Sequence, residues 1–349
     1  MTAIVFPGQG SQFVGMSQDF YDNFKVARLT LEEIEDYIQM DLKKIIFEND
    51  DNLLNITKFT QISIFTASLL IFKTLEKESK INTSSINIMM GHSLGEYTAL
   101  ACSNKLTLNQ CSLILKKRGD LMNDAVEPNT SGMAAIIGKE SSYIQKIIND
   151  NNINLEIAND NSPMQVVVSG DIKEIENSKD LFLNNNVKKY VVLNVSAAFH
   201  SKYMIEAQNI LSEEIESLSF STNNISLLSN FSAEISNDNN IIKKSLQKQM
   251  ANKVRWTESI KRLEETGETE IIEIGPNKIL SGLIKRISNK FDITSISNLE
   301  GELLVSSAQY GSQHKAVNEL NDKVKILKEQ LDKKIEELIA KGIDTNDPL

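Results

Sequence analysis

Short apolar runs alternate along the chain with longer segments whose apolar residues recur every three or four positions. The runs at residues 3–6 and 86–90 are too short for helices and predict buried strands. Residues 30–47, 60–75 and 108–126 have the spacing of amphipathic or buried helices. Strands that alternate with helices in this way predict an α/β fold, in which a mostly parallel sheet is covered on both faces.

A different order of elements follows in the middle of the chain. The pattern predicts strands at residues 133–137, 155–158, 165–169 and 189–194, and helices at residues 141–149 and 172–183. The order strand, helix, strand, strand, helix, strand is that of a ferredoxin-like unit. We therefore expect residues 129–195 to form an inserted small subdomain, while residues 1–128 and 196–298 form the large one.

The end of the chain has a third kind of sequence pattern. Apolar residues recur at a heptad-like spacing among many Lys, Glu and Asp residues in 317–343, which predicts a C-terminal coiled-coil-like or docking helix. Residues 299–316 are polar and contain glycine, so they are expected to be a linker. A helix that folds back on the body of the protein is the alternative, and the pattern does not decide between the two.

Composition narrows the class of protein. An apolar fraction of 41% supports a core of normal size, and a net charge of -10 argues against extensive nucleic-acid binding, which needs a basic face. The two cysteines, Cys102 and Cys111, lie in apolar helix-like stretches and predict buried, reduced thiols. We see no signal-peptide pattern, no metal-ligand spacing and no apolar run long enough to span a bilayer, so we expect a cytoplasmic protein without a metal.

One sequence motif is typical of enzymes with a nucleophilic serine. Residues 91–95 read Gly-His-Ser-Leu-Gly, which has the G-x-S-x-G form, and they stand directly between a predicted strand and a predicted helix. A sharp strand-to-helix turn presents the central serine at a helix N-terminus, where backbone N–H groups favour developing negative charge. A glycine-bracketed turn with a surface serine is the alternative, but the strand and helix favour Ser93 as a nucleophile.

The base that would activate this serine is found by elimination among three histidines. His92 adjoins Ser93 on the turn, where neighbouring side chains diverge, and His314 lies in the predicted linker. His200, just after an apolar strand, is therefore the favoured general base, because serine activation usually requires an imidazole within hydrogen-bond reach. No Asp or Glu stands out as a third member, and a backbone carbonyl could orient the ring instead.

Several motifs together resemble one family, in the family's order. The segments that carry the resemblance are 6–12 (Phe-Pro-Gly-Gln-Gly-Ser-Gln), 91–96, 117–122, 132–138, 198–201, 249–257 and 273–287. They are similar to the malonyl-CoA:acyl-carrier-protein transacylases, and most like the trans-acting acyltransferases of polyketide synthases. The resemblance covers about residues 1–298. It implies an α/β-hydrolase-like large subdomain with an inserted ferredoxin-like small subdomain.

The resemblance also implies roles at matching positions. Ser93 would form the acyl-enzyme, and His200 would act as general acid and base. Gln9 and Leu94 would supply backbone N–H groups to the oxyanion hole. Gln249 would orient His200 through its backbone carbonyl, in place of an acid.

Two further positions concern the substrate. Arg118 follows two lysines, so a solvated charged face is the plain interpretation, but the resemblance implies a bidentate pair with the malonyl carboxylate. Phe199 and Ala198 match the specificity positions of the histidine motif. The bulky Phe199 resembles the malonyl-type motif, although Ala197 stands where the family usually has histidine.

The expected activity is therefore transfer of malonyl from malonyl-CoA to the phosphopantetheine thiol of an acyl carrier protein, in polyketide or fatty-acid biosynthesis, with no bound cofactor. The expected partner is the holo acyl carrier protein, with docking to a polyketide synthase or self-association through the tail helix. Basic residues could steer the acidic carrier: Lys116, Lys117, Lys253 and Arg255. Two alternatives remain: a thioester hydrolase or serine esterase, and a scaffold protein of a megasynthase.

Overall fold

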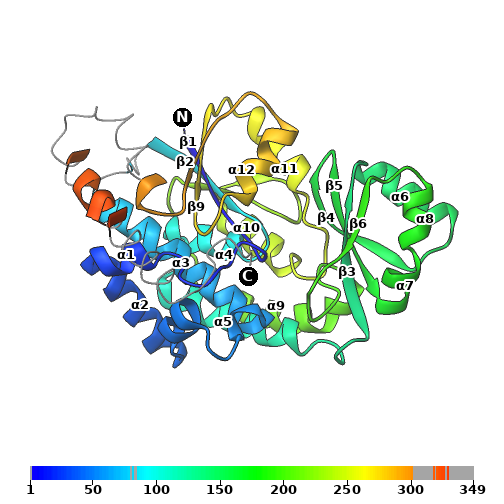
Figure 1. Ribbon diagram of the computed structural model, residues 1–349, viewed down its shortest axis with the longest axis horizontal. Helices are drawn as coiled ribbons and strands as arrows, with labels where there is room; N and C mark the ends of the chain where they lie inside the picture. Colours follow the sequence, from blue (N-terminus) through cyan, green and yellow to red (C-terminus); the bar gives the residue numbers. More distant parts are fainter. Residues whose placement is uncertain are drawn as a thin grey trace.

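The computed structural model describes residues 2–78, 81, 85–301, 317–318, 320–326 and 328–329. Two sheets of unequal size organise the chain, and in chain order the small sheet is inserted between strands of the large one (Figure 1). Within these described residues, the large sheet is mixed and has six strands, and the small one has four antiparallel strands. The expected α/β class is confirmed at this level.

The large sheet is parallel except at one edge. Its strands are β1 (Thr2–Phe6), β2 (Ile86–Gly91), β7 (Ser226–Leu228), β8 (Ile235–Ser236), β9 (Glu270–Ile274) and β10 (Asp292–Ile296). They lie in the order β10-β9-β1-β2-β7-β8, and the β7–β8 pair alone is antiparallel. All residues of β1 are buried, as expected for a central parallel strand covered on both faces.

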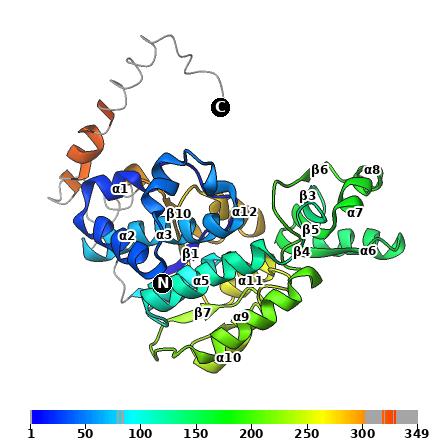
Figure 2. The ribbon, with the colours of Figure 1, turned by 90° about the horizontal axis from the view of Figure 1, so that it is seen from below.

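Helices cover both faces of the large sheet (Figure 1 and Figure 2). One layer contains α1 (Gln18–Asn23), α2 (Lys25–Ile38), α3 (Thr57–Lys77), α4 (Gly95–Cys102), α5 (Leu108–Asn123), α9 (Ile205–Ser217) and α10 (Asn239–Gln247). The other contains α11 (Trp256–Glu264) and α12 (Ile279–Ile287). Residues of β1 alternate between the layers, since Ile4 and Phe6 pack with the first group while Ala3 and Val5 pack with the second.

The small sheet has a core of its own. Its strands are β3 (Ser131–Ile137), β4 (Leu155–Ser162), β5 (Gln165–Asp171) and β6 (Lys189–Val192), in the order β4-β5-β3-β6. Its helices are α6 (Ser141–Asp150), α7 (Ile172–Asn177) and α8 (Lys179–Asn184), which pack on one face. The opposite face presents Met133, Ala135 and Val167 toward the large sheet.

A short backbone connection joins the two sheets. The Asp160 N–H donates to the Val254 carbonyl at 2.9 Å, and the Val254 N–H donates to the Ala158 carbonyl at 2.8 Å. This places β4 beside the segment that leads into α11. Because the contact is made by backbone, it fixes how the two sheets face each other across the space between them.

Two predicted helices are interrupted in the structure. The prediction over residues 30–47 is wrong in extent, because α2 ends where Gln39 takes a left-handed conformation with φ 52°, and Lys44–Glu48 forms a separate π-helix. The single helix predicted over 172–183 is two helices in the structure, α7 and α8, which meet at Ser178. Apolar spacing continues across both breaks, so periodicity alone could not reveal them.

The described part of the tail lies against the body of the protein. Val317, Leu320 and Val324 are buried, and the latter two belong to the large hydrophobic core that also contains residues of α1 and α2. The Lys323 ammonium lies 3.9 Å from the centroid of the Phe24 ring. The predicted linker after residue 301, and much of the predicted helix 317–343, fall outside the described residues.

Candidate active site

The turn between β2 and α4 places Ser93 where the central strand ends and a helix begins. Ser93 has φ 53°, a left-handed conformation that residues other than glycine seldom adopt. Glycines on either side permit the turn, since a Cβ on Gly91 would lie 2.1 Å from the Gly95 carbonyl carbon, and one on Gly95 would lie 2.2 Å from the Phe6 oxygen. The sequence therefore forms a strained turn that holds the Ser93 hydroxyl at one fixed point.

Asn230, in the loop after β7, holds this turn from the side. Its Oδ1 accepts from the Ser93 N–H at 2.6 Å, and its Nδ2 donates to the Gly91 carbonyl at 2.7 Å. Sequence analysis missed Asn230, because one asparagine in an asparagine-rich chain carries no signal and its contact with Ser93 spans 137 positions. This side chain explains how the strained backbone is stabilised.

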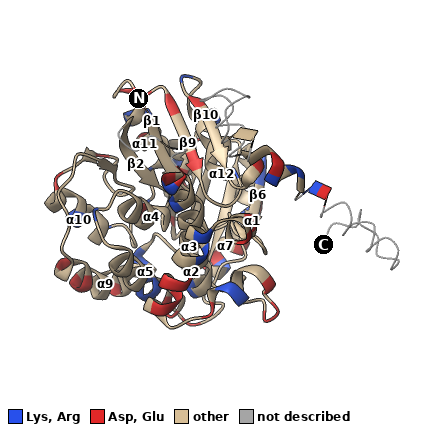
Figure 3. Cartoon of the chain, turned by 90° about the vertical axis from the view of Figure 1, so that its left-hand side faces the viewer, with Lys and Arg blue, Asp and Glu red and all other residues tan. Residues whose placement is uncertain are grey.

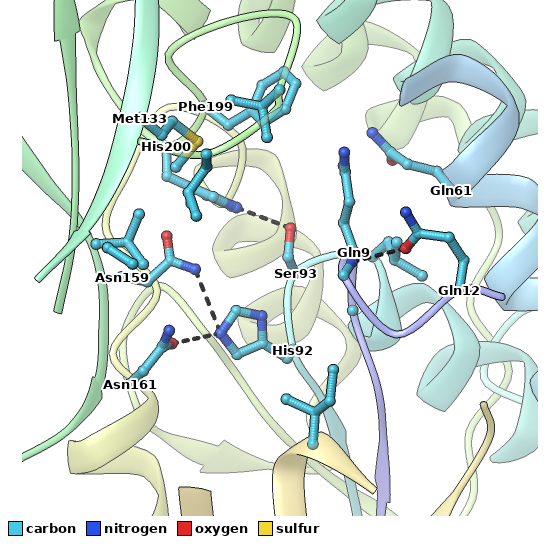
Figure 4. A pocket seen from close by; sticks show the side chains of 18 of the residues that line it. Gln9, Gln12, Gln61, His92, Ser93, Met133, Asn159, Asn161, Phe199 and His200 are labelled. Carbon is cyan, nitrogen blue, oxygen red and sulfur yellow. Dashed lines mark hydrogen bonds between the residues drawn. The ribbon is translucent and has the colours of Figure 1, made fainter. Parts of the chain in front are cut away.

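Ser93 and His200 are brought together across 107 positions of the chain. The Ser93 Oγ lies 2.8 Å from the His200 Nε2 (Figure 4). The His200 Nδ1 lies 3.1 Å from the carbonyl oxygens of both Gln249 and Asn252. A carbonyl can only accept, so Nδ1 carries the proton and the Nε2 lone pair faces the serine hydroxyl. The Gln249 carbonyl therefore lies beside His200, and Asn252 supplies a second carbonyl that sequence analysis missed.

The electrostatic surroundings keep the His200 imidazole neutral. Burial, followed by the nearby Arg118 and His92, lowers the pKa of His200 to about 3. At neutral pH its Nε2 is therefore free to accept a proton from the hydroxyl that it contacts.

Arg118, on α5, approaches the same hydroxyl from another side. Its Nη2 lies 3.0 Å from the Ser93 Oγ and 3.0 Å from the Gln249 Oε1, and its Nη1 donates to the Gln61 Oε1. The Tyr97 ring lies beneath the guanidinium at 5.4 Å. Arg118 is 1% exposed, and within the described residues it makes no ion pair with an Asp or Glu. The plain interpretation as a solvated charge is wrong, because a buried cation here has neutral partners.

Glu96 and Gln249 extend the network behind Ser93. The Gln249 Nε2 donates to the Glu96 Oε2 at 2.8 Å and to the Ser93 carbonyl at 2.8 Å. Glu96 is 3% exposed, and burial raises its pKa to about 7. Neither the Gln249 side chain nor Glu96 was singled out from the sequence, since both contacts depend on how α4 meets the loop after α10.

His92 points away from the catalytic pair and toward the small sheet. Its Nε2 lies 2.8 Å from the Asn161 Oδ1 and 3.4 Å from the Asn159 Nδ2, both on β4 (Figure 4). Burial lowers its pKa. The expectation that neighbouring side chains diverge at this turn agrees with the geometry, and His92 instead links the turn to the second sheet.

A pocket of about 450 Å³ opens over Ser93, between the two sheets. Its walls include Ser93, His200 and Arg118 from the large unit, together with Met133 and Val167 from the small sheet. A site with a nucleophile, a neutral base and an unneutralised buried cation is suited to acyl transfer from a substrate that carries a negative charge.

The other predicted positions lie around this pocket in different ways. Gln9 and Leu94 line it beside Ser93, and neither backbone N–H has a hydrogen-bond partner within the described residues. Phe199 lines it as well, with its carbonyl held by the Ser169 hydroxyl at 2.6 Å. Ala198 is fully buried behind the wall, where its N–H donates to the Ser131 Oγ at 3.0 Å.

The part of the chain that the structure describes also bears on metal, membrane and thiol chemistry. It contains no cluster of three or more His, Cys, Asp and Glu side chains able to hold a metal ion. None of its helices combines the length and apolarity that crossing a membrane requires. Cys102 and Cys111 are buried free thiols whose pKa is raised by burial, so they are poor nucleophiles.

Comparison with known proteins gives one consistent family. A model of the acyl transferase domain matches residues 3–318. The malonyl CoA-acyl carrier protein transacylase of Bacillus subtilis is 34% identical over 302 residues, which are 85% of this chain and 94% of that protein. The polyketide biosynthesis malonyl CoA-acyl carrier protein transacylase PksC of the same organism is 35% identical over 289 residues, covering 82% and 97%.

Solved structures agree with the sequence relatives. An acyl-carrier-protein S-malonyltransferase from Bartonella henselae superposes with a TM-score of 0.83 at 30% identity, covering 88% of this chain and 98% of that one. A complex of a type II polyketide synthase acyl-carrier protein with its malonyl-transacylase gives a TM-score of 0.83 at 31% identity, covering 88% and 99%.

Proposed function

Since this chain belongs to the malonyl-CoA:acyl-carrier-protein transacylase family, which confirms the resemblance seen in its motifs, we propose how its own residues carry out the transfer of malonyl to a carrier-protein thiol. Ser93 is the nucleophile and His200 the general acid and base. Arg118 binds the substrate carboxylate. One observation carries this assignment: the Ser93 Oγ lies 2.8 Å from the His200 Nε2 and 3.0 Å from the Arg118 Nη2.

The first half-reaction acylates the enzyme. The Ser93 oxygen attacks the thioester carbon of malonyl-CoA while the His200 Nε2 takes the hydroxyl proton. The free backbone N–H groups of Gln9 and Leu94 stabilise the oxyanion. Collapse of the tetrahedral intermediate breaks the C–S bond, and His200 returns the proton to the departing CoA thiolate.

The second half-reaction transfers the acyl group. His200 takes the proton of the carrier-protein thiol, whose sulfur attacks the acyl-serine carbonyl. The C–O bond to Ser93 breaks, and the proton moves from His200 to the Ser93 oxygen. Both carbonyls that hold the His200 Nδ1 support this two-way role, because they keep the ring in one orientation and stabilise its transient positive charge.

Arg118 supports the choice of a carboxylated acyl group. Its two bonded glutamine oxygens orient the guanidinium without neutralising it, and Nη2 already reaches the position of the serine hydroxyl. A planar guanidinium matches a carboxylate with two parallel hydrogen bonds. Phe199 and Met133 bound the space beside it, which favours malonyl over larger extender units.

The proposal extends to the subdomain architecture, the partner protein, the cellular compartment and the pathway. The order β4-β5-β3-β6, with three helices on one face, supports a ferredoxin-like subdomain inserted into an α/β-hydrolase-like one. The partner is a holo acyl carrier protein, as in the solved complex of the homologue. Buried free thiols support a reducing compartment such as the cytoplasm. The Ala-Phe-His motif and the tail favour polyketide over fatty-acid biosynthesis.

A competition assay tests the proposed specificity. Malonyl-CoA and acetyl-CoA compete for transfer to a holo carrier protein, and mass spectrometry measures the ratio of products. Arg118→Ala should lower the malonyl-to-acetyl ratio roughly 10- to 100-fold, because a charge-assisted pair is lost. Lys117→Ala is the matched control, since Lys117 is half-exposed and pairs with Glu214 at 3.7 Å; its ratio should stay at the wild-type value.

Two results would contradict the proposal. An unchanged ratio for Arg118→Ala would remove that residue from substrate selection. Release of free malonate faster than transfer, with carrier protein present, would indicate a thioester hydrolase instead of a transacylase.

A further inference from the structure

The side chain of Gln249 stands between the buried cation and a buried acid. Its Oε1 accepts from the Arg118 Nη2 at 3.0 Å, and its Nε2 donates to the Glu96 Oε2 at 2.8 Å. The same Nε2 donates to the Ser93 carbonyl at 2.8 Å. Gln249 is 1% exposed, so solvent cannot replace any of these partners.

Glu96 determines the orientation of the Gln249 side-chain amide. The Glu96 Oε2 and the Ser93 carbonyl are both acceptors, so the NH₂ group must lie toward them and the oxygen must lie toward Arg118. In the reverse orientation, the NH₂ group would face the guanidinium, donor against donor, and two acceptors would lose their hydrogen bonds. An unpaired buried polar group costs about 1–3 kcal/mol, which is enough to fix one orientation.

Glu96 is placed to orient Arg118 without pairing with it. Glu96 lies on α4, three positions after Ser93, and its Oε2 also accepts from the Asn230 N–H at 3.3 Å. In a direct Glu96–Arg118 ion pair, the protein's own carboxylate would occupy the guanidinium N–H groups and compete with a substrate carboxylate. With the Gln249 amide between them, Glu96 fixes the orientation of the guanidinium through two hydrogen bonds. The Arg118 N–H groups then stay available for a substrate carboxylate.

We propose that Glu96 is a positioning residue for carboxylated acyl substrates, and that it acts through the Gln249 amide on the guanidinium of Arg118. This inference rests on the proposed carboxylate-binding role of Arg118. It assigns selectivity for malonyl to a chain of three side chains, Glu96, Gln249 and Arg118, of which the arginine alone contacts the substrate.

The test is a set of variants in which acylation of Ser93 is measured with malonyl-CoA and with acetyl-CoA, as kcat/KM for each. Glu96→Leu removes the acceptor and should lower the malonyl-to-acetyl ratio roughly tenfold. Glu96→Gln keeps an oxygen that can accept at the same place and should keep the ratio within about threefold of wild type. Any loosening of the serine turn through Asn230 would slow both substrates and leave the ratio unchanged.

A double-mutant cycle separates positioning from a merely structural effect. Gln249→Met keeps the backbone carbonyl that holds His200 but removes the amide, and it should lower the ratio as far as Glu96→Leu does. If Glu96 acts through Gln249, adding Glu96→Leu to Gln249→Met should produce no further change in the ratio. An additive loss, or an unchanged ratio in Glu96→Leu, would overturn the proposal.

Arg118→Ala, assayed in parallel, keeps the two hypotheses distinguishable. If Arg118→Ala leaves the ratio unchanged, the carboxylate site itself is wrong. If Arg118→Ala lowers the ratio and Glu96→Leu does not, the role of Glu96 alone is refuted. Should Glu96→Leu fail to fold, the comparison of Glu96→Gln with Gln249→Met decides, since an equal loss in both would contradict a role based on the acceptor oxygen.

Discussion

At His200, burial and two neighbouring groups act on the imidazole in the same direction. Desolvation, Arg118 and His92 all disfavour the charged ring, and the pKa falls from 6.5 to about 3. The hydrogen bonds to the carbonyls of Gln249 and Asn252 oppose this shift but do not cancel it. The His200 ring is therefore neutral at neutral pH, as the proposed role of general base requires.

The pH dependence of acylation follows from this shift. The rate of Ser93 malonylation should show no inflection near pH 6.5, because His200 stays unprotonated down to about pH 3. Single-turnover rates between pH 5 and 8 check this, with Glu96→Gln as the background, since Glu96 titrates near pH 7 in the wild type. A loss of half the rate near pH 6.5 would contradict the buried, neutral base.

The free energy of unfolding should fall as the pH is lowered, because of the same pKa shift at His200. Between pH 6.5 and about 3, the unfolded state binds a proton on His200 that the folded state does not. The free energy of unfolding that His200 contributes is therefore present above pH 6.5 and is lost as the pH falls toward 3.

Roles that the family motifs carry could be predicted from the sequence, and contacts between side chains far apart in the chain could not. Ser93, His200 and Arg118 were identified in advance, and the structure places them around one hydroxyl. Asn230 was missed, and Glu96 was quoted only as the last residue of the segment 91–96, without a role. Their contacts with Ser93 and Gln249 join positions more than 100 residues apart, and such pairs leave no local pattern.

Among the elements, the β2–α4 turn shows how backbone sterics create the site. Its strain is tolerated because Gly91 leaves no side chain against the Gly95 backbone, and Gly95 leaves none against Phe6 of β1. The sequence pattern predicted this turn well, since G-x-S-x-G between strand and helix has a steric cause. Interrupted helices were predicted poorly, because the break at Gln39 depends on a left-handed conformation that hydrophobic spacing does not report.

Substitution of Gly91 tests the steric account. Gly91→Ala would place a Cβ 2.1 Å from the Gly95 carbonyl group and should lower the free energy of unfolding by about 2–4 kcal/mol. Gly282→Ala is the matched control, because a Cβ there meets nothing within 4 Å and the position lies within α12. Chemical denaturation should show the control unchanged or up to about 1 kcal/mol more stable. Equal stability of both variants would refute the steric account.

At the scale of the whole molecule, the catalytic pocket belongs to neither sheet alone. The turn after β2 supplies the proposed nucleophile Ser93, the loop between β6 and α9 supplies the proposed base His200, and the small sheet lines the space beside them with Met133 and Val167. The order of the small unit's elements could be predicted from the sequence. Its placement could not, because it depends on the backbone contact between Asp160 and Val254.

Four basic residues were named as candidates for steering an acidic carrier protein: Lys116, Lys117, Lys253 and Arg255. Lys and Arg residues are interspersed with Asp and Glu over the helices (Figure 3). Lys117 pairs with Glu214 and Arg255 with Glu258, while Lys116 donates to the Ile38 carbonyl. These three contacts do not test whether the four basic residues steer a carrier protein, and that role stays a prediction.

The central claim is that malonyl passes through Ser93, activated by His200, in the pocket between the sheets. Intact-protein mass spectrometry after brief incubation with malonyl-CoA, without carrier protein, tests it directly, with peptide mapping to locate the adduct. The wild type should gain one malonyl group on the peptide that contains Ser93 and lose it when holo carrier protein is added, while Ser93→Ala should gain none. A malonyl adduct that persists in Ser93→Ala, or that maps to another residue, would contradict the account.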